Sequence, residues 1–209
     1  MEEVLDLYQE PFNPAKPVVT FDERPVQLIS ETRQPLPAQL GQLERYDYEY
    51  QREGTANLFE FFQPLAGWRQ VTVRERRTKV DWAQEMEDLL RTRYASAEKV
   101  ILVCDNLNTH TKGAFYEAFE PAKARALVKG LEFCHTPKHG SWLNIAENEL
   151  SSMTRQSITG RRFGTVGEVR QETTPWCDHS NARQRSVDWQ FKVGDARLKL
   201  KSVYPKLEV

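Results

Sequence analysis

Residues 100–106 read VILVCDN, an apolar run that ends directly in Asp105. A short, continuous apolar run is typical of a strand buried on both faces of a sheet. Residues 18–23, VVTFDE, repeat this arrangement and end in Asp22 and a glutamate. In open α/β sheets, ligand sites lie beyond the carboxyl ends of the strands. We therefore expect Asp22 and Asp105 to meet at one edge of the sheet.

The segments around these two runs alternate between strand-like and helix-like patterns. A period of two, or a short apolar run, predicts a strand, and a period of 3.6 predicts a helix. Pro25 is expected to close the first strand, and Ser141 to N-cap the helix that follows the last one. The further strands are predicted at 43–50, 56–62, 68–74 and 131–135, and the helices at 81–94, 113–119, 122–128, 141–155 and 166–178. This order indicates an α/β fold in which helices flank a mixed sheet.

Composition favours an ordinary globular chain in a reducing compartment. The 209 residues are 39% hydrophobic and 28% charged, and the 3 cysteines suggest no disulfide framework or standard zinc spacing. We find no apolar run of about 18 residues and no signal peptide, so we expect a cytoplasmic, nucleoid-associated protein without a membrane partner. Residues 1–16 are proline-rich and predict a linker remnant ahead of one domain over 17–209.

Charge is distributed unevenly along the chain. The net charge is −1, yet residues 150–209 carry 11 Lys and Arg against 6 Asp and Glu. This basic stretch could contact a phosphate backbone or could simply be a solvated face. The arginines that would form a DNA track are Arg155, Arg161, Arg162, Arg170, Arg183 and Arg185.

A third acid is expected from the helix after Ser141. Glu147 and Glu149 lie about 200° apart on a helix, so only one of them can face the two aspartates. We choose Glu147, because Asn144 lies one turn earlier on nearly the same face; both glutamates could instead face solvent. Three gathered carboxylates suit a pair of Mg²⁺ or Mn²⁺ ions and should raise the pKa of at least one of the acids.

Four ordered motifs carry a family resemblance. Residues 21–23, 104–110, 135–147 and 189–201 together resemble the DDE transposases of the mariner-like superfamily, in its bacterial insertion-sequence branch. The resemblance implies a ribonuclease-H-like, retroviral-integrase-like fold with a five-stranded sheet. It also implies a working homodimer that cuts double-stranded DNA at element ends and joins the 3′-hydroxyls to a target. Two Mg²⁺ or Mn²⁺ ions would be held by the catalytic triad, Asp22, Asp105 and Glu147.

Further DNA contacts are expected from the loops that rim the site. Polar side chains there could position a phosphate, although the asparagines could equally cap local turns. Trp142 is expected to pack in the core rather than to stack on a base. The candidate DNA-binding residues are Asn106, Asn108, His110, Lys138, His139, Asn144, Arg161 and Arg162.

Two other functions stay open at this point. The chain could be a non-catalytic transposase remnant that dimerises with an intact transposase or competes for its DNA. It could also be a nuclease of the same fold that acts on RNA–DNA hybrids.

Overall fold

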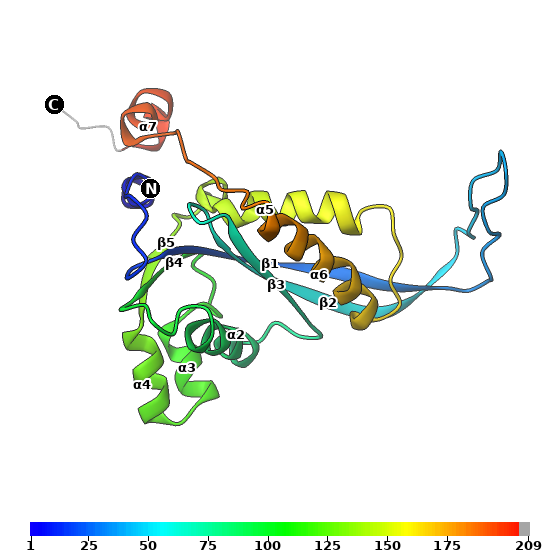
Figure 1. Ribbon diagram of the computed structural model, residues 1–209, viewed down its shortest axis with the longest axis horizontal. Coiled ribbons are helices and arrows are strands. Elements are labelled where there is room, and N and C mark those ends of the chain that lie inside the picture. The colour runs from blue at the N-terminus through cyan, green and yellow to red at the C-terminus, as the bar shows by residue number, and fades with distance from the viewer. Residues whose placement is uncertain (205–209) are drawn as a thin grey trace.

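The computed structural model describes residues 1–204 and is built around one mixed sheet (Figure 1). The strand order is β3-β2-β1-β4-β5. β1, β2 and β3 pair antiparallel, whereas β4 and β5 run parallel to β1. The strands are β1 (Val18–Glu31), β2 (Tyr50–Gln63), β3 (Trp68–Arg74), β4 (Val100–Cys104) and β5 (Leu131–His135).

The first two strands differ from the sequence prediction. β1 does not close at Pro25 but continues to Glu31, so Asp22 lies inside the strand. β1 pairs with β4 only over Val18–Thr20, and beyond that point it is an edge strand, where proline is tolerated. The strand predicted at 43–50 is wrong apart from its last residue, because this segment is exposed and has no apolar face to bury.

Helices cover both faces of the sheet, as predicted (Figure 1). On one face, Trp82 and Phe115 pack in a core with Phe21 of β1. On the other face, Leu150 and Trp176 pack in a second core against the hairpin of β1 and β2. The first face carries α2 (Lys79–Arg91), α3 (Lys112–Ala118) and α4 (Pro121–Lys129). The second carries α5 (Ile145–Met153), a π-helical turn (Thr154–Ile158) and α6 (Val166–Ala182).

Capping residues set the helix starts and shift two of them from the prediction. α2 begins before Asp81, because Thr78 and Asp81 form a capping box. Ser141 is not an N-cap: it begins a 3₁₀ turn (Ser141–Leu143), and Asn144 caps α5. α6 also runs past its expected end and contains Pro175.

The chain ends meet in a third, smaller core. α1 (Glu2–Leu7) and α7 (Val193–Lys199) lie close together and precede and follow the sheet in sequence; a 3₁₀ turn (Lys201–Val203) follows α7. The Tyr8 hydroxyl donates to the carbonyl of Leu143 at 2.8 Å, so residues predicted as a linker remnant pack on the body of the domain. Residues 205–209 of the predicted domain lie outside the described residues.

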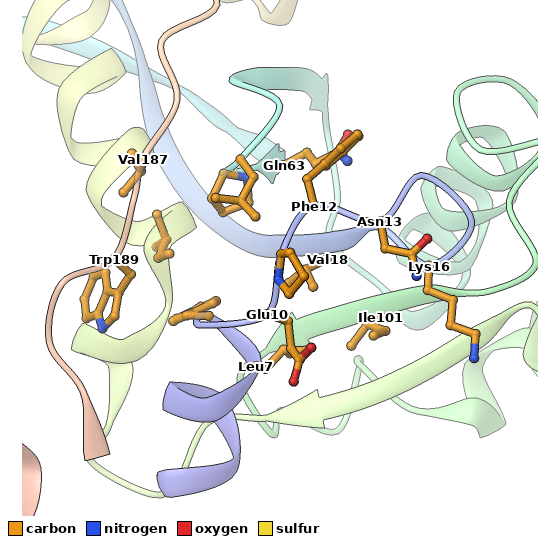
Figure 2. Close-up of a pocket in the computed structure, with 15 residues that line it drawn as sticks. Leu7, Glu10, Phe12, Asn13, Lys16, Val18, Gln63, Ile101, Val187 and Trp189 are labelled. Carbon is orange, nitrogen blue, oxygen red and sulfur yellow. The ribbon is translucent and has the colours of Figure 1, made fainter. Parts of the chain in front are cut away.

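An apolar pocket of about 340 Å³ opens beside α1 (Figure 2). Phe12, Val18, Ile101 and Trp189 are among its lining residues. None of the three candidate catalytic acids lines it. No helix within residues 1–204 is long and apolar enough to cross a membrane.

Residues 32–49, which we call the arm, project from the hairpin of β1 and β2 (Figure 1). Arg162 anchors its base by a bidentate contact to Glu31 at 2.8 and 2.9 Å. The same guanidinium stacks over the rings of Tyr46 and Tyr50, at 4.5 and 5.8 Å from the centroids. The arm is therefore held at its root by one arginine.

Candidate active site

The two aspartates lie at matching positions of neighbouring parallel strands, Asp22 within β1 and Asp105 directly after β4. Thr20 of β1 is paired with Val103 of β4. Asp22 and Asp105 each follow two residues later, so the register of the sheet brings them to the same edge. This is the arrangement expected from the sequence, although Asp22 lies inside a strand rather than after one.

Asn144, the N-cap of α5, places Glu147 at this edge of the sheet. The Asn144 side chain accepts from the amide of Ala146 and donates to the carbonyl of Phe21 at 2.8 Å. Because Phe21 precedes Asp22, this amide ties the start of α5 to the backbone of the first aspartate. Asn144 is only 3% exposed, and this geometry favours a positioning role for it over the DNA contact expected from the sequence.

The charges of the other two acids act on Asp22. Burial, and then the charges of Asp105 and Glu147, raise the pKa of Asp22 to about 6, although the hydrogen bond from the amide of Glu23 lowers it. The prediction that at least one acid would have a raised pKa is confirmed. Ionised Asp22 is therefore costly in this protein without a cation.

The donor chemistry of this site fits hard divalent cations. Three carboxylates offer only oxygen atoms, which are the ligands that Mg²⁺ and Mn²⁺ prefer. Among residues 1–204, no three His, Cys, Asp or Glu side chains converge closely enough to hold an ion. The side chain of Asp105 is instead engaged by His110, whose Nδ1 lies 2.6 Å from its Oδ1.

His110 does not lie on the surface, which corrects the expectation of a DNA contact. Its side chain is 1% exposed and packs against Phe21 and Trp82. Burial lowers the pKa of His110, but the contacts with Asp105 and Glu23 outweigh burial and raise it to about 9. The physical reason is that apolar side chains on the α2 and α3 face of the sheet enclose the imidazole between two carboxylates.

A buried acid–base cluster lies beside the site and was missed by sequence reasoning. Glu60 is the cross-strand partner of Asp22, is fully buried and has no hydrogen-bond partner. Burial and the nearby charge of Glu149 raise its pKa well above the usual value, while Arg69 lowers it. Arg69 is itself buried, with Nε 2.9 Å from Glu149. The alternative that both glutamates of α5 face solvent is therefore wrong for Glu149, which is buried. The one sequence signal for this cluster was Glu60, a glutamate inside the apolar run of β2.

The loops around the acids leave several polar groups exposed. Asn106 and Asn108 after β4, and Lys138 and His139 before α5, are all exposed, as a DNA contact requires. Trp142 is also 41% exposed and meets Phe191 edge-on at 5.6 Å, so the prediction that it packs in the core is wrong. It lies in a 3₁₀ turn in which Leu143, and not Trp142, is the buried residue.

The arginines expected along the basic C-terminal part are partly neutralised. Arg161 is paired with Glu172, and Arg162 with Glu31, so neither offers an unpaired charge. Arg155, Arg183 and Arg185 are exposed. A DNA track through Arg161 and Arg162 is therefore weakly supported by their contacts.

Asp22 and Asp105 thus lie two residues beyond the last residue pair between β1 and β4, and Glu147 lies on α5, which covers the sheet. A family model described as "DDE superfamily endonuclease" matches residues 17–170. The chain belongs to the DDE superfamily of endonucleases.

Solved structures of similar fold come from a mariner transposase. The "Mos1 mariner paired end complex with Mn" has a TM-score of 0.55 at 16% identity and covers 88% of this chain and 56% of that one. The "Mos1 Strand Transfer Complex" has a TM-score of 0.58 at 16% identity, with 88% and 54% covered. These likenesses confirm the expected ribonuclease-H-like fold. The chain spans about half the length of these Mos1 chains, and no curated protein matches it.

Proposed function

We propose that this chain is the catalytic domain of a transposase that hydrolyses phosphodiester bonds at element ends and transfers the 3′-hydroxyls into target DNA. The observation that carries the proposal is the register of the sheet, which brings Asp22 and Asp105 to one edge, together with the contact of Asn144 with Phe21, which ties the start of the Glu147 helix to that edge. The family membership and the fold of the Mos1 complexes support it. The bacterial insertion-sequence branch remains part of this proposal.

The roles of the residues follow from their places. Asp22, Asp105 and Glu147 would hold two Mg²⁺ or Mn²⁺ ions, and Asp22 would lose any proton it carries when the ions bind. Bound divalent cations supply Lewis-acid chemistry, which activates the attacking hydroxyl and stabilises the leaving oxygen. The exposed loop residues Lys138 and Asn106 would contact the DNA backbone near the scissile bond.

The partners of the proposed enzyme are double-stranded DNA and a second copy of the chain. The similar solved structures are paired-end and strand-transfer complexes of Mos1. Joining two DNA ends in one assembly suits a homodimer. Measuring the molar mass of the protein in solution, with and without DNA, tests the homodimer directly.

One observation favours the second candidate, a non-catalytic remnant that binds DNA or dimerises. Within residues 1–204, the three acids do not form a closed ligand set. A remnant would keep the fold and the exposed loops but would not gather its carboxylates around a cation. Cation-dependent cleavage therefore separates the two functions.

The deciding experiment is nicking of supercoiled plasmid in Mg²⁺ or Mn²⁺. We expect the wild type to nick and Asp105→Asn to be inactive, while the matched control Asp178→Asn, an exposed acid on α6, stays active. Equal nicking by wild type and Asp105→Asn would refute the assignment. A folded wild type that binds DNA without nicking it would establish the remnant.

A further inference from the structure

His110 occupies a buried position between β1 and the loop after β4 at the candidate site. Its ring is 1% exposed, with the centroid of Phe21 at 5.0 Å and that of Trp82 at 5.6 Å. Nδ1 lies 2.6 Å from Oδ1 of Asp105, which is hydrogen-bond distance. Oδ1 of Asp105 is therefore held by the buried side chain of His110.

The other side of the ring faces a second carboxylate. Nε2 of His110 lies 3.6 Å from Oε2 of Glu23, and both atoms are buried without a hydrogen-bond partner. Glu23 follows Asp22 on β1 and points to the opposite face of the sheet. Its Oε1 is held at 3.2 Å by Arg77. The imidazole thus lies between β1 and the loop after β4, which are the segments that carry the two candidate catalytic aspartates.

We propose that His110 is a positioning residue for Asp105: its Nδ1 fixes Oδ1 of the carboxylate, so that the other oxygen is presented to the cations, and Glu23 fixes the ring from behind. The inference rests on the proposed function of the acids. Hydrogen-bond partners of metal ligands commonly change cation affinity by about 10- to 100-fold when they are removed. His110 does not touch the substrate, so its effect passes entirely through Asp105.

Two substitutions separate positioning from packing. In His110→Asn, the side-chain amide nitrogen falls near the position of Nδ1 and can still donate to Asp105. In His110→Gln, the amide nitrogen falls near Nε2 and faces Glu23 instead. Glutamine is closer to histidine in volume, so a packing role predicts that Gln is the milder change. A positioning role predicts the reverse order for cation affinity.

The measurement is calorimetric titration of each metal-free, DNA-free protein with Mn²⁺ alone, after urea unfolding has shown that the variants fold. We expect His110→Gln to weaken Mn²⁺ binding by about 10- to 100-fold and His110→Asn to retain most of the affinity. Equal affinities, or a weaker Asn variant, would overturn the inference while leaving the proposed function intact. A wild type that binds no Mn²⁺ would refute both.

A second measurement uses the wild type and covers the case in which a variant does not fold. The nitrogen-bound protons of the His110 ring can be observed by nuclear magnetic resonance of ¹⁵N-histidine protein, which has 4 histidines. We expect the Nδ1 proton to stay hydrogen-bonded and protected from exchange when Mg²⁺ saturates the protein. Loss of that proton signal on Mg²⁺ binding would show that Asp105 leaves His110, and would overturn the inference.

Discussion

Replacing Asp22 by asparagine should stabilise the metal-free protein, and only at neutral pH. The pKa of Asp22 is raised from 3.8 to about 6, chiefly by burial and then by Asp105 and Glu147. The folded protein thus binds this proton more tightly than the unfolded chain does, so its stability falls as the pH rises from about 4 to 6. A shift of this size costs the wild type about 3 kcal/mol at most above pH 6.

Asparagine resembles the protonated acid and can still accept from the amide of Glu23. We therefore expect Asp22→Asn to gain about 2–3 kcal/mol of unfolding free energy at pH 7.5 in a chelator, and about 0 at pH 3.5. Urea unfolding at both pH values measures this, with Asp178→Asn as the exposed-acid control. A gain of the same size at both pH values would refute the electrostatic reasoning.

Three further predictions test the surroundings of the site. Arg69→Met removes the buried cation beside Glu149 and should cost about 3–5 kcal/mol at pH 7, and less at pH 4, in urea unfolding; an equal loss at both pH values would contradict this. Arg162→Ala should speed hydrogen exchange in the arm while changing global stability by about 1 kcal/mol or less, since the ion pair is partly exposed; unchanged exchange would show that the arm is held elsewhere. Lys138→Ala should weaken DNA binding uniformly across sequences and reduce the salt slope by about 0.9, whereas Lys129→Ala on α4 should not; an unchanged slope would remove Lys138 from the interface.

The sequence predicted the elements whose patterns are local. The apolar run of β4 and the helical period of α2 and α3 needed no tertiary information, and the parallel register then placed Asp22 and Asp105 together. The strand prediction at 43–50 failed because this segment alternates polar and aromatic residues but buries neither face. An alternating pattern forms a strand only where a neighbouring strand can pair with the segment and a core can bury one of its faces.

The sequence proposes the three acids of the candidate site but does not reveal their surroundings. Glu147 followed from helical geometry and the motif, but the burial of His110 depends on contacts with Trp82 and Phe21, far away in sequence. Glu60 gave a weak signal as one acid within an apolar run. Its proximity to Glu149 required the packing of α5 on the sheet, which no local pattern encodes.

The central claim is that three distant acids share divalent cations, and crystals soaked in Mn²⁺ test it most directly through anomalous diffraction. The account predicts anomalous peaks bounded by the carboxylates of Asp22, Asp105 and Glu147 in the wild type, and their loss in Asp105→Asn. Peaks elsewhere, or none at saturating Mn²⁺, would contradict it.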